Sequence, residues 1–222
     1  MAETRAIART RTFLYLVLDE SQSMEGERRR VISAYNEFLH SQRRQRVDEL
    51  FVTLLKFNTG VRAVYRALPV ESAPTLQPKQ YEPSGLTALY DGIRVAIAQA
   101  DEEAGATDRV LVVVLTDGED NSSRIDKRDL RRVMDDRRSR GNWTFVLLGA
   151  GVDIDRLAVD LGVSGGNTAS TEDFTEALRR VDRNVSVYRS DDALRTDRFH
   201  HPPKRWRRPT WATSTITLTD TE

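Results

Sequence analysis

Apolar runs of strand length alternate with helical patterns along most of the chain, and this alternation restricts the possible folds more than any other feature. Continuous apolar runs predict strands buried on both faces, whereas apolar residues spaced by three or four predict helices. The expected strands are 13–18, 51–57, 61–68, 110–115 and 143–148, and the expected helices are 25–46, 89–100, 125–134, 152–161 and 174–188. This order predicts an α/β fold with a doubly wound, mostly parallel sheet and helices on both faces.

The second and third expected strands are separated only by Asn58, Thr59 and Gly60, a turn typical of a hairpin. We therefore expect one antiparallel edge strand in an otherwise parallel, Rossmann-like sheet. In such sheets, ligands bind beyond the carboxyl ends of the strands, at the point where the strand order reverses. Residues that directly follow a strand are therefore the first candidates for a functional site.

Composition limits the class of protein. At 222 residues, with 39% hydrophobic and 31% charged residues, the chain is long enough for one large domain or two small ones. Lysine plus arginine equals aspartate plus glutamate, 34 against 34, so there is no overall attraction to nucleic acid or membranes. The absence of cysteine excludes disulfides and is compatible with a reducing compartment. No apolar run exceeds strand length and no secretory signal begins the chain, so we expect a cytoplasmic protein without membrane contact.

Oxygen-bearing side chains follow the expected strands. The first strand ends at Asp19, and two hydroxyls come next at alternate positions, Ser21 and Ser23. Alternate residues that leave a strand project the same way, so all three can point into one pocket. The most apolar strand is followed by Asp117, and Thr87 precedes a helical pattern between the two strands. Because hard divalent cations take oxygen ligands, these residues predict a metal site at the carboxyl end of the sheet.

With these segments in this order, the chain resembles a von Willebrand factor type A domain with its metal-ion-dependent adhesion site. That family carries an Asp-x-Ser-x-Ser motif, a separate threonine and a separate aspartate. The matching residues are Asp19, Ser21 and Ser23, then Thr87, then Asp117. The resemblance covers about residues 10–188. We therefore expect an N-terminal extension at 1–10, the domain itself at 11–188, and a flexible or loosely docked C-terminal tail at 189–222.

The resemblance also implies a function. In that family the hydroxyls ligate a divalent cation directly, here Mg²⁺ or Mn²⁺, and the aspartates often act through water. A cation held mainly by neutral oxygens stays electrophilic and favours an anionic oxygen from outside. The implied role is a protein-interaction module without catalytic activity, whose partner protein supplies a glutamate or aspartate to the metal.

Each candidate ligand also has an ordinary structural explanation. Ser21 and Ser23 are typical of helix caps and turns, and Thr87 is typical of a helix N-cap. Asp117, which precedes a glycine, is typical of a turn. Asp91, one turn into the helix after Thr87, either forms a second shell that hydrogen-bonds the metal loops or favours the helix N-terminus, and the second explanation is preferred.

A Mg²⁺-dependent phosphohydrolase or phosphotransferase of similar topology is the alternative function, because such enzymes also place an aspartate after the first strand. An aspartyl nucleophile of that kind has a second catalytic aspartate two residues on, where this chain has Ser21. Such a site also needs a lysine that binds phosphate. We expect no lysine near Asp19, Thr87 or Asp117, with Lys127 the nearest, and both departures favour the binding module.

The remaining polar features carry little functional signal. In the tail, the basic segment Lys204 to Arg208 is the only candidate for contact with nucleic acid, which we do not expect as a partner. Thr213 to Thr219 has an alternating pattern that predicts an edge strand. The three histidines, His40, His200 and His201, lie far from the carboxylate motifs, so no histidine metal site is expected.

Overall fold

The structure is a computed structural model that describes residues 11–45, 48–150, 152–170, 174–190 and 195–200. Its strands are β1 (Arg11–Asp19), β2 (Glu49–Phe57), β3 (Val61–Pro69), β4 (Arg109–Thr116), β5 (Trp143–Gly149) and β6 (Thr168–Ser170). Its α-helices are α1 (Arg28–Arg43), α2 (Leu89–Glu103), α3 (Lys127–Ser139), α4 (Ile154–Leu161) and α5 (Phe174–Arg189). Short 3₁₀ helices cover Gln22–Glu27, Pro78–Gln80 and Gly165–Asn167. Within the described ranges, no helix is both long and apolar enough to cross a membrane.

The strands form one six-stranded sheet in the order β3-β2-β1-β4-β5-β6. β1 pairs in parallel with both β2 and β4, and β5 is parallel to both β4 and β6. β3 runs antiparallel to β2 at one edge, so the predicted mostly parallel sheet with one antiparallel edge strand is confirmed. The strand order reverses between β1 and β4, which makes their carboxyl ends the expected place for a ligand.

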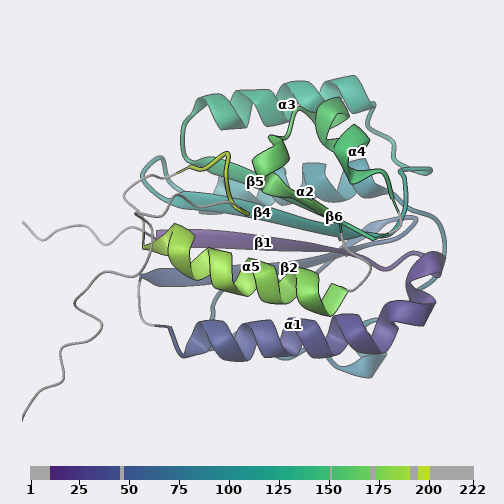
Figure 1. Ribbon diagram of the computed structural model, residues 1–222, viewed down its shortest axis with the longest axis horizontal. Coiled ribbons are helices and arrows are strands. Elements are labelled where there is room, and N and C mark those ends of the chain that lie inside the picture. The colour runs from purple at the N-terminus through teal and green to yellow at the C-terminus, as the bar shows by residue number, and fades with distance from the viewer. Residues whose placement is uncertain (1–10, 46–47, 151, 171–173, 191–194, 201–222) are drawn as a thin grey trace, which may run out of the picture.

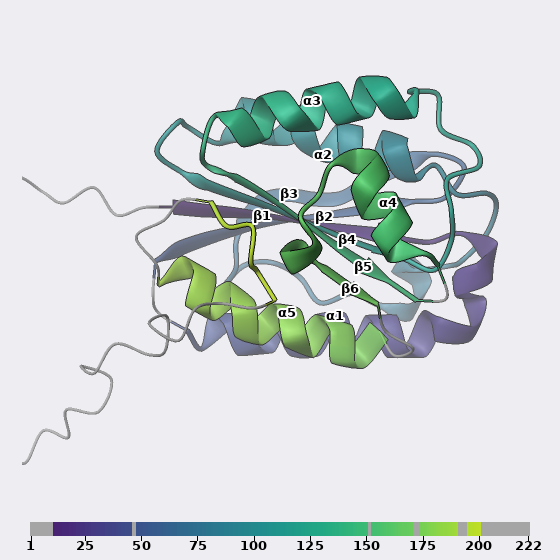
Figure 2. The same ribbon diagram turned by 45° about the horizontal axis from the view of Figure 1, so that its top comes forward.

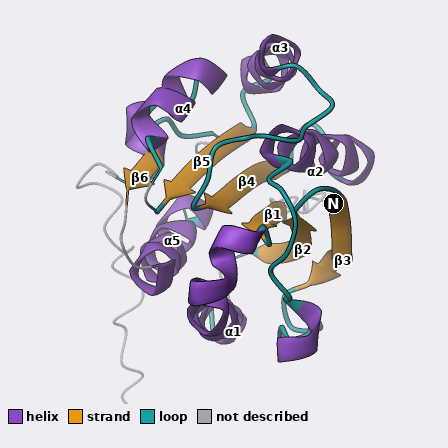
Figure 3. Cartoon of the chain, turned by 90° about the vertical axis from the view of Figure 1, so that its right-hand side faces the viewer, coloured by secondary structure: helices purple, strands orange, loops and turns teal. Residues whose placement is uncertain are grey.

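Helices cover both faces of the sheet, as Figures 1 and 2 show. α1 and α5 lie on one face, and α2, α3 and α4 lie on the other, an arrangement visible end-on in Figure 3. Alternate side chains of β1 divide between the two cores. Leu14, Leu16 and Leu18 belong to the core under α1 and α5, whereas Tyr15 and Val17 belong to the other. Because β1 is buried on both faces, its residues 13–18 are continuously apolar.

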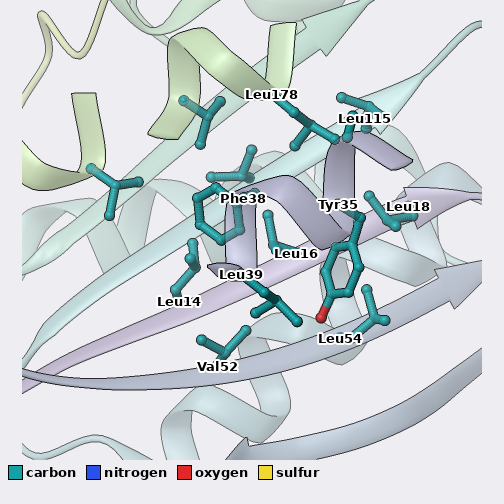
Figure 4. Close-up of a cluster of buried hydrophobic side chains, with 14 of the residues drawn as sticks. Leu14, Leu16, Leu18, Tyr35, Phe38, Leu39, Val52, Leu54, Leu115 and Leu178 are labelled. Atoms are coloured by element: carbon teal, nitrogen blue, oxygen red, sulfur yellow. The ribbon is translucent and has the colours of Figure 1, made fainter. Parts of the chain in front are cut away.

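The core under α1 and α5 is drawn in Figure 4, where side chains of α1 point onto those of β1 and β2. Tyr35, Phe38 and Leu39 of α1 are at most 2% exposed, and so is Leu178 of α5. Fully burying a large apolar side chain stabilises a fold by about 1.5–3 kcal/mol relative to exposure. This packing therefore fixes α1, and with it the segment that joins β1 to α1.

Two local features differ from the expectations. The helix expected from about residue 25 begins as α1 at Arg28, because Gln22–Glu27 forms a 3₁₀ helix. β6 has no counterpart among the expected strands, because three residues with the sequence Thr-Ala-Ser give no apolar run. It is held in the sheet by parallel pairing with the end of β5.

The described part of the expected C-terminal tail packs against the domain. Phe199 is 1% exposed, and its ring centroid lies 6.2 Å from that of Tyr188. Its backbone N–H donates to Asn167 Oδ1 at 2.9 Å. Residues 195–200 therefore extend the core. The basic segment 204–208 and the edge strand predicted at 213–219 lie outside the described residues.

Neither edge of the sheet is a long, regular strand. In β3, Ala67 has a positive φ of 41°, and its N–H donates to Thr53 Oγ1 at 2.8 Å. The pairing of β3 with β2 shifts register between Val52 and Leu55. At the other edge, β6 pairs with β5 over three positions.

Candidate metal centre

Asp19 lies at the carboxyl end of β1, at the point where the strand order reverses. Its side chain is fully buried. Asp19 Oδ1 accepts a hydrogen bond from the backbone N–H of Ser21 at 2.8 Å, and Oδ2 accepts one from Thr116 Oγ1 at 2.6 Å. Thr116 is the last residue of β4, so the two central strands meet at this carboxylate.

A series of short contacts joins the first motif to the third. Ser21 Oγ lies 3.1 Å from Ser23 Oγ, and Ser23 Oγ donates to Asp117 Oδ1 at 2.6 Å. Ser23 and Asp117 are 94 residues apart in the chain, so the fold alone brings them together. Ser21 occupies the N-cap position of the following 3₁₀ helix but makes no side-chain capping bond. Helix capping therefore does not explain Ser21.

Thr87 lies beside the loop that carries Asp117. The residue is 4% exposed, and a β-carbon built on Gly118 would lie 3.6 Å from Thr87 Oγ1. The N–H of Thr87 donates to Asn121 Oδ1 at 2.8 Å, and its carbonyl accepts from the Asn121 N–H at 3.0 Å. The N-cap of α2 is Ala88, so helix capping does not account for Thr87 either. Asn121 has no motif in the sequence that would single it out.

The loop before α2 is braced by the β2–β3 turn. Gly85 has a φ of +74°, and a β-carbon there would come within 2.6 Å of Thr59 Oγ1. Thr59 Oγ1 accepts the Leu86 N–H at 2.9 Å, and the Ala88 N–H donates to the Asn58 carbonyl at 2.7 Å. Any other residue at position 85 would be strained and would press on this brace. The three loops that carry the predicted ligands thus lie at the end of the sheet that faces the viewer in Figure 3.

Asp91 holds the loop that follows Asp117. Its Oδ2 accepts the Arg124 N–H at 3.0 Å, and its Oδ1 accepts the Ile125 N–H at 3.1 Å. Its own N–H donates to Ser123 Oγ at 3.0 Å. The preferred sequence interpretation, in which Asp91 simply favours the N-terminus of α2, is therefore insufficient, because the carboxylate also anchors a loop of the candidate site.

Asp19 and Asp117 both bring a carboxylate to the candidate site. Burial raises the pKa of Asp19 above its ordinary value, and the charge of Asp117 adds to the shift, although hydrogen bonds from Ser21 and Thr116 lower the pKa. In the described part of the chain, no three histidine, cysteine, aspartate or glutamate side chains gather into a metal cluster. The predicted donors are instead two carboxylates and three hydroxyls. This all-oxygen set fits Mg²⁺ or Mn²⁺.

One lysine does approach the site in space. Lys56 of β2 is buried and donates to Glu20 Oε1, and Glu20 directly follows Asp19 in the chain. The expectation that no lysine lies near, with Lys127 the nearest, is therefore wrong. Lys56 Nζ also donates to the Gln80 carbonyl, and its side chain has no exposed surface. A lysine held in this way is not free to bind a phosphate, so it does not favour the phosphotransferase alternative.

Comparison with known proteins finds the family that the sequence resembles. Residues 14–119 match the family model of the von Willebrand factor type A domain. Among solved structures, the fold is similar to a von Willebrand factor type A protein from Catenulispora acidiphila (19% identity, TM-score 0.57, 82% of this chain and 43% of that one). It is also similar to the pilus adhesin SpaC from Lactobacillus rhamnosus GG (15%, TM-score 0.63, 82% and 30%). No curated protein matched the sequence.

A third similar structure is proximal thread matrix protein 1 from the mussel byssus, described with a zinc-occupied MIDAS motif (14% identity, TM-score 0.57, 80% of this chain and 45% of that one). This chain spans less than half the length of each of these three structures.

Fold and site together define a doubly wound α/β domain with a cluster of oxygen donors at its topological switch point. The family-model match identifies residues 14–119 with the von Willebrand factor type A domain, and the solved structures share this fold.

Proposed function

We propose that the chain binds a divalent cation and, through it, a partner protein. The single observation that carries this proposal is the contact series from Ser21 through Ser23 to Asp117, which ends in a 2.6 Å hydrogen bond across 94 residues of sequence. The proposed ligands, acting directly or through water, are Asp19, Ser21, Ser23, Thr87 and Asp117.

Mg²⁺ or Mn²⁺ is the proposed cation. All five donors are oxygens, the ligands that these ions take, whereas Zn²⁺ is held mainly by nitrogen and sulfur in structural sites. The zinc in the mussel protein is a property of that protein. When bound, the ion supplies a Lewis-acidic centre with a position for an external oxygen. Asp91 would contribute by holding the Asp117 loop through the Arg124 and Ile125 N–H groups.

A carboxylate from a partner protein is the proposed external ligand. Three of the five donors are neutral hydroxyls, so the protein neutralises the cation incompletely and an added anionic oxygen is favoured. Leu86, beside Thr87, is 51% exposed and offers an apolar contact next to the proposed ligand. We therefore propose an aspartate or glutamate of another protein as the recognised group.

We propose binding rather than catalysis. Ser21 stands where an aspartyl phosphotransferase has its acid–base aspartate, and Lys56 is engaged by Glu20 and Gln80. We also propose a cytoplasmic location, and its support is the absence of cysteine from the sequence. Cell fractionation would test it separately.

The test has a metal arm and a partner arm. Mn²⁺ binding is measured by electron paramagnetic resonance for the wild type, Asp19→Ala and Leu86→Ala, with exposed Asp129→Ala of α3 as the matched carboxylate control. The same proteins are then used to capture partners from native lysate, with Mg²⁺ or with EDTA.

We expect Mn²⁺ binding to be lost in Asp19→Ala and kept in Asp129→Ala and Leu86→Ala. Partner capture should need Mg²⁺, fail with Asp19→Ala and weaken with Leu86→Ala. Equal Mn²⁺ binding by wild type and Asp19→Ala would remove the metal site. A partner captured equally with Mg²⁺ and with EDTA would place recognition elsewhere on the chain.

A further inference from the structure

Glu20 directly follows the first candidate ligand, yet its side chain is buried, with 6% of the residue exposed. Its N–H donates to the Phe57 carbonyl at 2.7 Å, and its carbonyl accepts from the Ser84 N–H at 2.9 Å. Its Oε1 accepts from the Glu82 N–H at 2.7 Å. One residue therefore ties the end of β1 to the end of β2 and to the loop that leads into α2.

Lys56 supplies the opposite charge. The exposed fraction of its side chain is 0%, and that of the Glu20 side chain is 7%. Lys56 Nζ donates to Glu20 Oε1 and to the Gln80 carbonyl, and it lies 5.8 Å from the ring centroid of Tyr81. A nitrogen of Arg62 also lies 3.8 Å from Glu20 Oε2, but the Arg62 side chain is 68% exposed and exposed ion pairs contribute little, whereas removing one partner of a buried pair is strongly destabilising. The geometry of this pair is therefore tightly held.

The loop held by this pair is the one that delivers Thr87. Tyr81 Oη donates to the Asp19 carbonyl, so the residue after Gln80 is attached to the first motif. Further along, the Gln22 N–H donates to the Gly85 carbonyl at 3.2 Å. With the bonds from Glu82 and Ser84 to Glu20, the loop is thus fastened to the first motif at four points before it reaches the proposed ligand.

We propose that the Lys56–Glu20 ion pair is a positioning element of the candidate metal site. It sets the cation affinity by holding the loop with Asp19 against the loop with Thr87, without itself touching the cation. This inference rests on the proposed function, because it requires that a cation binds at these loops. Removing a group that orients metal ligands typically lowers the metal affinity by about 10–100-fold.

The opposite end of the sheet provides a matched control. Arg189 is an equally buried cation, with 1% of its side chain exposed, and it is paired with Asp48. Methionine replaces the long stem of either side chain without its charge. Mn²⁺ affinity is measured by electron paramagnetic resonance for wild type, Lys56→Met and Arg189→Met, at a temperature where circular dichroism shows each protein folded.

We expect Lys56→Met to bind Mn²⁺ about 10-fold or more weakly than wild type, and Arg189→Met to bind it equally well. An unchanged affinity in Lys56→Met would overturn the inference. An equal loss in Arg189→Met would also overturn it, because any loss of stability would then have the same effect. If the wild type itself does not bind Mn²⁺, the proposed function is wrong. Failure of the positioning inference and failure of the proposed function are therefore distinguishable.

A second variant keeps the test decisive if Lys56→Met does not fold. Glu20→Gln retains an oxygen that can accept from the Glu82 N–H and removes only the negative charge. The same Mn²⁺ measurement then has the same two outcomes: a loss of about 10-fold or more supports the positioning role, and wild-type affinity rejects it.

Discussion

Asp48, at the amino ends of the strands, and Asp19, at the carboxyl ends, both have buried side chains, but their partners differ. At the amino ends of the strands, Asp48 accepts from Arg189 and, at 2.6 Å, from Thr12 Oγ1, while a nitrogen of Arg109 lies 3.9 Å away. At the carboxyl ends, the hydrogen bonds to Asp19 come from a backbone N–H and a hydroxyl, both neutral.

This difference distinguishes a buried carboxylate that is neutralised within the fold from one that is not. Asp48 is neutralised by arginine side chains of the same chain, so its burial is compensated within the fold. Among the described residues, no cationic side chain pairs with Asp19, and burial raises the pKa of Asp19. A divalent cation would supply the missing charge. The predictions below test whether the amino end serves stability and the carboxyl end serves binding.

The largest effect is expected at the amino end. Arg189→Met should lower the free energy of unfolding by about 3 kcal/mol, because Asp48 stays buried with weaker compensation. Urea unfolding at neutral pH measures the change. If the free energy of unfolding fell by less than about 1 kcal/mol, stability would not depend on the Arg189–Asp48 pair. The proposed contrast between the two ends of the sheet would then be wrong.

The second effect is confined to the carboxyl end. Mg²⁺ at 100 times its dissociation constant should stabilise the wild type by about 2.7 kcal/mol, because it binds the folded state alone. For a domain of this size, that shift corresponds to a Tm higher by about 5–10 °C. Calorimetry with and without EDTA should show the same increment in Arg189→Met and none in Asp19→Asn. An increment that survives in Asp19→Asn would place the cation elsewhere.

A smaller effect is expected for the loop anchor. Asp91→Ala leaves the Arg124 and Ile125 N–H groups without their carboxylate, at a cost of about 1–2 kcal/mol in the free energy of unfolding. Mn²⁺ affinity should fall by about 10-fold, because the Asp117 loop is released. Asp129→Ala, which breaks an exposed pair with Arg132, is the control and should change stability by less than about 1 kcal/mol. Unchanged Mn²⁺ affinity in Asp91→Ala would make Asp91 a purely structural residue.

The smallest effect is expected at Tyr188, in the core under α1 and α5. Burial raises the pKa of Tyr188 from 10.0 to about 12. Between these values the folded state keeps a proton that the unfolded state loses, so stability falls as the pH rises through this window and is unaffected below it. Tyr188→Phe should remove a loss on the order of 1 kcal/mol near pH 11. Urea unfolding of both proteins at pH 9 and pH 11 measures it, and identical pH dependence would contradict the buried phenol.

The sequence predicts the sheet well because the signals are strong and local. β1, β4 and β5 are continuously buried, and their apolar runs are unbroken or nearly so. β6 escapes prediction because it depends on pairing with the end of β5 rather than on its own three residues. The antiparallel edge strand follows from the short turn between β2 and β3.

The candidate site is predictable only in part, since the predicted ligands and the residues that support them carry different signals. Asp19, Ser21 and Ser23 follow a strand at regular spacing, so a pattern exposes them. The partner of Glu20 lies 36 residues away, and no spacing rule connects the two. The available signal was Lys56 itself, a charged residue in the buried part of β2, because such a residue needs a buried partner.

The irregular edges of the sheet affect whether the domain can pair its strands with those of other chains at high protein concentration. Exposed edge strands can recruit strands from other chains, and short, bent or charged edges prevent this. β6 offers three residues, while β3 is irregular at Ala67 and presents exposed Arg62 and Arg66. In the described part of the chain, neither edge is a flat template for fibre-like growth. A domain with such edges can sit among many copies and many partners while its backbone pairing stays internal.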